Sequence, residues 1–162
     1  MSTQDTDAHP RFAQALRELG LEVPVRRFPD ATRTAAEAAA AIGCDVSEIV
    51  KSLIFEADGA PVLVLMDGSS RVDVERVRQE LGAESVKRAG ADLVRETTGF
   101  AIGGVPPFGH ATRTRVLADR GLLDHDVVWA AAGTPHTVFP LDPKTLIEHA
   151  GGVLVDVRER TA

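Results

Sequence analysis

The sequence predicts a single mixed α/β domain of the α+β class, and three observations support this expectation. The chain has 162 residues, of which 44% are hydrophobic and 26% charged, which suits one globular domain with its own core. Apolar residues recur at helical spacing in some segments and alternate as in strands in others. Two apolar runs within residues 47–68 flank Asp58-Gly59, the pattern of a β-hairpin. Because a hairpin is antiparallel and helices separate the other strands, we expect a mixed or antiparallel sheet.

The chain begins with a polar segment that predicts no packed structure. Residues 1–10 are therefore expected to form a disordered tail, and the folded domain to span residues 11–162. Phe12, Leu16 and Leu19 then recur at helical spacing, which predicts a helix that ends at Gly20.

A strand and an alanine-rich helix are expected next. Residues 23–28 alternate in polarity as a strand does. The alanines that follow favour a helix that begins at a cap, either Thr32 or Thr34, and ends at Gly43. The hairpin of residues 47–68 comes directly after this helix.

Three short elements are expected between the hairpin and residue 97. Residues 72–81 place valine and leucine on one helical face, which predicts an amphipathic helix. A short strand near Val86 and a helix over residues 91–97 follow.

The last third of the chain opens with a glycine- and proline-rich loop, residues 97–110, in which no periodicity survives. Residues 127–132 and 137–141 then predict two strands. Asp142-Pro143 predicts a helix start by capping and by a proline in the first turn, and residues 153–157 predict a final strand.

Composition and missing motifs exclude several classes of protein. A net charge of −6 argues against a broad nucleic-acid-binding surface, although a small basic site remains compatible with it. The polar N-terminus, the lack of a long apolar run and the single cysteine are typical of a cytoplasmic protein with no membrane span. The chain has no P-loop, no GxGxxG and no GxSxG motif, and its histidines are scattered, so we expect no cofactor and no metal. Cys44 is interpreted as a small buried residue rather than as a nucleophile.

Lys51 is anomalous because it lies inside the first apolar run of the hairpin. On a strand it shares a face with Leu53 and Phe55, where an unpaired ammonium group would be costly to bury. One explanation is that the side chain reaches solvent at the strand end, with Glu48 or Glu56 as its partner. The other is that it is a cation held at the mouth of a pocket for an anionic or carbonyl oxygen.

Two glycine-containing turns are further candidates for a binding site. Gly103-Gly104, followed by Pro106, permits close approach of a ligand to main-chain N–H groups, although a rigid connector would show the same pattern. Gly133, Thr134 and His136 follow a strand of small residues, which leaves room for a ligand beside hydrogen-bonding groups, although an ordinary tight turn is the alternative.

Taken together, these segments resemble a known family. IVKSLIF, VDVERVRQELGA, TGFAIGGVPPFGH and VVWAAAGTPHTVFPL, in this order and spacing, are similar to the YbaK-like family, also known as the prolyl-tRNA synthetase insertion-domain or aminoacyl-tRNA deacylase family. The resemblance covers residues 23–157 and is to a free-standing member, since no synthetase domain is attached. It implies a compact mixed fold around a central, barrel-like sheet, and hydrolysis of the ester that links a wrong amino acid to the 3′ end of a tRNA.

The resemblance also implies site residues. The family positions that this chain matches are the lysine, the glycine-proline loop, a pocket aromatic and the hydroxyl after the lysine, which are Lys51, Gly103, Gly104, Pro106, Phe28 and Ser52. The terminal adenosine is then expected to stack on Phe28, with Arg26 or Arg27 on a phosphate.

This chain departs from the cysteine-removing members of the family. Those members carry a serine where this chain has Ala131, and a basic residue after the turn where this chain has Thr134-Pro135-His136. We therefore expect a small amino acid other than cysteine: serine or threonine first, then alanine.

The expected reaction needs no enzyme nucleophile, since none is evident beside Lys51. Water, or a group of the substrate, would attack an ester that Lys51 and the loop N–H groups position and polarise. The expected partner is the acceptor end of an aminoacyl-tRNA, with a synthetase as a further candidate and with neither DNA nor a membrane involved. The alternatives are a non-catalytic module of the same fold that binds an aminoacyl-nucleotide, a tRNA end or a synthetase, and a hydrolase of another acylated nucleotide.

Overall fold

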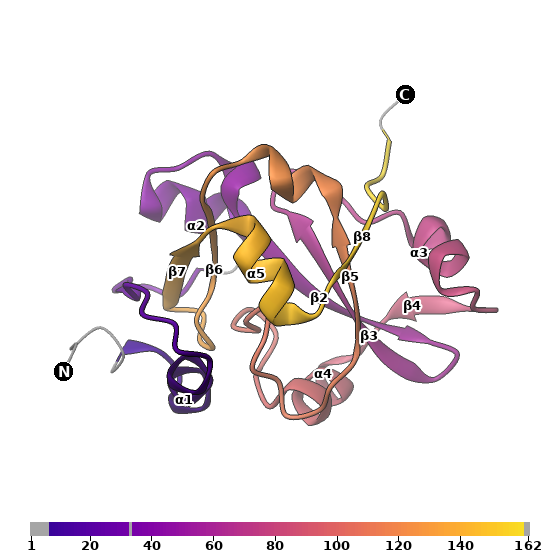
Figure 1. Cartoon of the computed structure of the whole chain (residues 1–162), viewed down its shortest axis with the longest axis horizontal. Coiled ribbons are helices and arrows are strands. Elements are labelled where there is room, and N and C mark those ends of the chain that lie inside the picture. The colour runs from indigo at the N-terminus through magenta and orange to yellow at the C-terminus, as the bar shows by residue number, and fades with distance from the viewer. Residues whose placement is uncertain (1–6, 33, 161–162) are drawn as a thin grey trace.

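The computed structural model describes residues 7–32 and 34–160 (Figure 1). Its helices and strands, with two short 3-10 helices labelled η, are in chain order α1 (Pro10–Leu19), β1 (Arg26–Arg27), α2 (Ala35–Ile42), η2 (Val46–Glu48), β2 (Val50–Ala57), β3 (Ala60–Asp67), α3 (Val74–Leu81), β4 (Val86–Arg88), α4 (Ala91–Thr98), β5 (Arg115–Asp119), η3 (Arg120–Asp124), β6 (Val128–Ala131), β7 (Thr137–Leu141), α5 (Pro143–Ala150) and β8 (Val153–Val155).

The larger of two sheets is mixed, as the sequence predicts. Its strand order is β4-β2-β3-β5-β8. The first two pairs are antiparallel and the last two are parallel. The hairpin β2–β3 turns at Asp58-Gly59, whose φ angles of 50° and 84° are both positive, the backbone of a two-residue hairpin turn that matches the strand twist.

The smaller sheet has the order β1-β7-β6 and is antiparallel. A single parallel bridge between Ile49 and Trp129 joins it to the start of β2. The two sheets therefore meet at one end of β2 and do not close into a barrel. Where the sequence predicts one barrel-like sheet, the structure has two sheets around a shared core.

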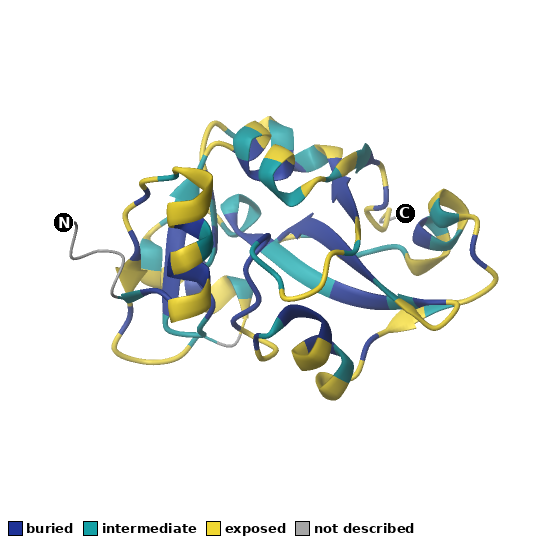
Figure 2. Cartoon of the chain, turned by 60° about the horizontal axis from the view of Figure 1, so that its bottom comes forward, coloured by how far each residue is buried: buried dark blue, intermediate teal, exposed yellow. Residues whose placement is uncertain are grey.

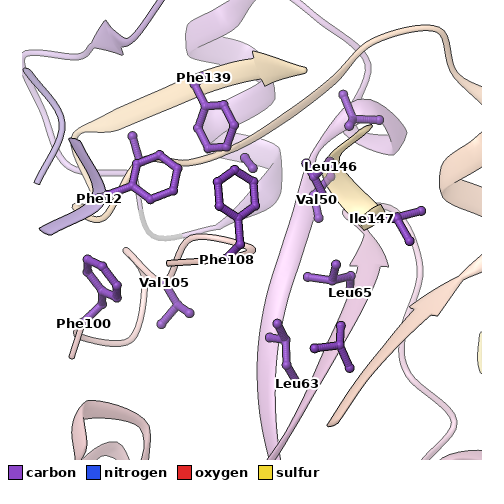
Figure 3. Packing of buried hydrophobic residues seen from close by; sticks show 14 of the residues in the cluster. Phe12, Val50, Leu63, Leu65, Phe100, Val105, Phe108, Phe139, Leu146 and Ile147 are labelled. Carbon is purple, nitrogen blue, oxygen red and sulfur yellow. The ribbon is translucent and has the colours of Figure 1, made fainter. Parts of the chain in front are cut away.

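Both faces of the larger sheet are covered by apolar packing. On one face, Phe12 of α1, Phe139 of β7 and Phe108 point toward one another above the strands (Figure 3). On the other face, Val77 of α3 packs with Phe55 of β2 and its neighbours. Figure 1 shows α3 and β4 at one end of the molecule and α1 at the other, and Figure 2 shows the central strands buried and the helices exposed along their outer sides.

Local sequence signals explain the helix boundaries. The Thr34 side chain accepts a hydrogen bond from the Glu37 N–H and begins α2, so Thr34 rather than Thr32 is the cap. Asp73 and Asp142 cap α3 and α5 in the same way. Among the described residues, no helix is long and apolar enough to cross a membrane.

The structure differs from the sequence expectations in three places. The strand expected over residues 23–28 comprises only Arg26–Arg27, because only these two residues pair with β7. Val23 and Val25 are nevertheless buried. Strand β5 was not expected. The packed chain also begins earlier than residue 11: Ala8 is buried and the His9 N–H donates to the Ala132 carbonyl, while residues 1–6 lie outside the described part.

Phe12→Ala is expected to lower the free energy of unfolding by about 3–5 kcal/mol, because it removes a fully buried ring between two other phenylalanines. Leu19→Ala, in the same helix but 41% exposed, should cost less than about 1 kcal/mol. Urea unfolding of both variants measures the difference, and equal losses would contradict the packing described for α1.

Candidate active site

A cavity of about 530 Å³ lies where the two sheets meet. Its walls come from the first half of β2, from α2, from β6 and β7 with the turn between them, and from the loop around Gly103. Its surface is mainly apolar, and Lys51 and Arg88 are the charged residues among those that line it. A cavity of this size suits a small organic group.

The free edge of β2 runs along this cavity. Strand β4 pairs with β2 only from Phe55 to Ala57, and β6 forms one bridge, to Ile49 just before β2. The Ile54 carbonyl accepts a hydrogen bond from the Ala89 N–H, so even-numbered residues of β2 direct their main-chain groups toward this edge. The N–H and C=O of Ser52 consequently have no strand partner among the described residues and face the cavity.

The Lys51 side chain lines the same cavity from one face of β2. Its Nζ donates a hydrogen bond to the Ser70 carbonyl in the turn after β3, and neither Glu48 nor Glu56 is its partner. Burial lowers the pKa of the Lys51 ammonium, the nearby Asp67 carboxylate opposes that effect, and Arg88 and Arg71 add to it. Within residues 7–32 and 34–160, Lys51 is therefore a half-buried cation without an ion pair.

The loop before β5 presents Gly103 to the cavity and is fixed on both sides. The Gly104 N–H donates to the Ala101 carbonyl, so it is occupied, whereas Gly103, at φ 96°, lines the cavity. His110 Nε2 lies 2.6 Å from the Pro106 carbonyl, and burial lowers the pKa of this imidazole, so the neutral ring donates to that oxygen. Of the two loop N–H groups expected to meet an oxyanion, that of Gly103 remains open to one.

The turn between β6 and β7 packs directly on this loop. A Cβ at Gly104 would lie 2.8 Å from the Thr134 Cα, and one at Gly133, where φ is 99°, would lie 2.4 Å from the His9 Cβ. Both positions therefore require glycine. Thr134 Oγ1 bonds to Thr137 Oγ1 at 2.8 Å and accepts from the His136 N–H, which holds the turn in shape.

The structure brings together half of the residues expected at the site. Those that line the cavity are Lys51, Ser52, Gly103, Ala131 and Thr134. Those that lie behind the lining are Phe28, Gly104, Pro106, Gly133 and His136.

The roles expected for Phe28 and Arg26 do not fit the positions of these two residues in the structure. Phe28 is 5% exposed and its N–H pairs with the His136 carbonyl, so it is not placed to stack on a base. The Arg26 guanidinium donates to the Ile42 and Ala41 carbonyls and thereby holds the end of α2, which leaves it poorly placed for a phosphate.

Three other cavity residues were not among those expected from the sequence. Thr137 adds a buried hydroxyl, Trp129 adds an aromatic wall, and Arg88 adds a second cation. The only local signal was the single tryptophan of the chain, because threonine at a strand start and arginine in an exposed strand are ordinary.

The described residues that line the cavity include no carboxylate, imidazole or thiol. Cys44 lies outside the lining, and burial together with Glu48 and Asp45 raises the pKa of its thiol, the opposite of what a nucleophile needs. No group of three or more potential metal ligands occurs within residues 7–32 and 34–160. Ser52 Oγ is buried without a hydrogen-bond partner there.

Known proteins resemble this chain in sequence and in structure. The uncharacterized protein YwhH of Bacillus subtilis is 35% identical over 138 residues, which cover 84% of this chain and 87% of that protein. A proline–tRNA ligase of Streptococcus sanguinis is 32% identical over 92 residues, 57% of this chain but only 15% of the ligase. A solved structure described as "a putative trans-editing enzyme for prolyl tRNA synthetase" has a TM-score of 0.88 and 39% identity, with 99% of each chain covered.

A family profile also matches most of the chain. The profile described as the aminoacyl-tRNA editing domain matches residues 29–148, which include β2, the Gly103 loop and the β6–β7 turn. The chain therefore belongs to the aminoacyl-tRNA editing domain family.

Proposed function

We propose that this protein is a deacylase that acts in trans on mischarged tRNA and hydrolyses the ester between a small amino acid and the 3′-terminal ribose. The observation that carries the proposal is Lys51, a cation that lines a cavity of about 530 Å³ and forms no ion pair among the described residues. Family membership supports the reaction class. Similarity along nearly the whole of a protein described as a trans-editing enzyme supports action in trans, in the cytoplasm where tRNAs are charged.

Electrostatic positioning accounts for the chemistry. The Lys51 ammonium exchanges its contact with the Ser70 carbonyl for an oxygen of the substrate, either the ester carbonyl or a phosphate. The Gly103 N–H and the Ser52 N–H at the strand edge supply further donors to the developing oxyanion. Because no described residue of the lining is a carboxylate, imidazole or thiol, the attacking group is water or a hydroxyl of the substrate. Held on a strand, the ammonium keeps its position better than it would on a loop.

The cavity favours a small amino acid with a hydroxyl group. Small residues such as Ala130 and Ala131 limit the space, and Thr134 and Thr137 add hydroxyls to the wall. Ser52 Oγ is buried and unpaired, which costs about 1–3 kcal/mol, and rotation about χ1 toward a ligand hydroxyl would relieve that cost. The likeness to proteins named for proline makes tRNA specific for proline the first to test, and a prolyl-tRNA synthetase the first partner to test.

Lys51→Ala is expected to reduce deacylation by about 100-fold or more, since it removes the cation that stabilises the transition state. Its melting temperature should stay near that of the wild type, because the ammonium has no ion pair to lose. Lys51→Met, which keeps the methylene chain, should behave in the same way. Single-turnover rates on mischarged tRNA measure the effect, and wild-type rates would show that Lys51 is only structural.

The same residue sets a pH dependence. The cationic form is the active one and burial lowers its pKa, so the corrected rate should fall on the alkaline side before pH reaches the ordinary lysine value of 10.5. Spontaneous ester hydrolysis is subtracted at each pH.

A wild type that retains binding of the tRNA end but hydrolyses nothing would favour the non-catalytic binding module.

Gly104→Ala is expected to slow deacylation roughly 10- to 100-fold, because its Cβ would meet the Thr134 main chain at 2.8 Å and separate the loop from the turn. Some loss of thermal stability should accompany it. Gly90→Ala is the matched control, since nothing lies within 4 Å of its Cβ. A Gly104→Ala protein with a full rate per folded molecule would show that this contact does not shape the site.

The amino acid preference is expected to be serine or threonine, then alanine, with cysteine last. Single-turnover rates for the four aminoacyl-tRNAs test this order. Ser52→Ala should lower the ratio of the seryl to the alanyl rate, because a site that hydrogen-bonds a hydroxyl loses that advantage with the donor. His136→Ala should leave the ratio unchanged, since His136 lies behind the lining. Cysteine as the fastest substrate would contradict the ranking.

A further inference from the structure

Lys51 and Arg88 lie on one face of β2 and line the cavity, and Arg71 is near enough to act on the Lys51 charge. Lys51, Leu53 and Phe55 alternate onto the same face of the strand. The Arg88 guanidinium lies 5.5 Å from the centroid of the Phe55 ring, on that face, and Arg88 lines the cavity together with Lys51 and Leu53. Arg71 directly follows Ser70, whose carbonyl accepts the Lys51 hydrogen bond.

Among the described residues, no carboxylate forms an ion pair with this group, although the nearby Asp67 favours the Lys51 charge. None of the ion pairs found among the described residues involves Lys51, Arg71 or Arg88. The nearby Asp67 is buried and its Oδ1 already accepts from the N–H and Oγ of Ser69. Both arginines help to lower the pKa of Lys51, because each guanidinium repels the Lys51 ammonium. In a chain of net charge −6, such a group is typical of an anion site.

The opposite face of β2 has a different character. Ser52 and Ile54 point there, and the cavity wall beyond them is built from Val94, Val105 and Ala130. An apolar wall suits the side chain of a small amino acid, whereas the face with the arginines suits an anion. The free edge of β2 lies between the two.

We infer that Arg71 and Arg88 bind a phosphodiester group of the 3′-terminal nucleotides, while the aminoacyl group lies on the Ser52 side of the strand. This inference rests on the proposed function and deepens it. A guanidinium can bind two phosphate oxygens at once, so the arginines are better suited to this group than Lys51 is. Lys51 is then left to act on the ester carbonyl.

The test compares two substrates that carry the same amino acid. Aminoacyl-adenosine contains the ester but no phosphate, whereas an aminoacylated CCA trinucleotide adds two phosphodiesters. Arg88→Ala should lower kcat/KM for the trinucleotide roughly 10- to 100-fold, mostly through KM, and leave the adenosine rate within about twofold. Arg71→Ala should show the same selectivity. Arg88→Lys should recover part of the loss.

Lys87→Ala is the matched control. Lys87 precedes Arg88 in β4, carries the same charge and pairs with Glu56 on the opposite face, so neither substrate should be affected. Binding of an uncharged CCA-ended oligonucleotide, followed by fluorescence anisotropy against salt, gives a readout without catalysis. The salt slope should fall by about 0.7 for each arginine removed.

The outcomes separate the two proposals. If Arg88→Ala slows both substrates equally while the wild type hydrolyses both, this inference is overturned and the proposed function stands. If inorganic phosphate competes as well as the oligonucleotide at equal concentration, the site binds free anions and the RNA assignment is overturned. If the wild type hydrolyses neither substrate, both proposals are overturned together.

Discussion

The incomplete pairing of β2 determines the rest of the site. A strand inside a sheet has its main-chain groups occupied on both edges, and an unpaired edge away from water is costly. Here β4 pairs with β2 only from Phe55 onward and β6 forms a single bridge at Ile49, just before β2, so the edge of β2 between them borders a cavity instead of a paired strand. That gap explains how residues on both faces of β2, Lys51 and Ser52, line a single cavity.

The walls of the cavity depend on close contacts between segments that are distant in sequence. The Gly103 loop is held by the hydrogen bond between His110 and the Pro106 carbonyl and by packing against the β6–β7 turn. That turn itself packs against His9, just before α1. Each contact has the main chain or a glycine as at least one partner, which limits the movement of the Gly103 loop. Such preorganisation is what a reaction without an enzyme nucleophile requires, because its rate enhancement must come from fixed geometry and charge.

Features of the fold and the site that depend on a short local segment could be predicted from the sequence, whereas those that depend on tertiary contacts could not. The β2–β3 hairpin was predicted because Asp58-Gly59 is a local turn signal, and Lys51 because a cation in an apolar run is anomalous by itself. Strand β5 escaped prediction because only Val116, Leu117 and Ala118 are apolar in it, and its structure depends on parallel neighbours. Arg88, Thr137 and Trp129 are unremarkable within their own segments, and only the tertiary fold brings them to Lys51.

Charge distribution sets a limit on how much of a tRNA this protein can hold. Its net charge of −6 repels RNA at long range, and at physiological ionic strength interactions between exposed charges fade over about 8 Å. Attraction must therefore come from cations within that distance of the bound strand, and the group on the Lys51 face of β2 is placed to provide it. Under the proposed function, such a protein would bind the RNA end that reaches into its cavity and would gain little from the helical body, so discrimination among tRNAs would depend on the last few nucleotides or on a partner that presents them.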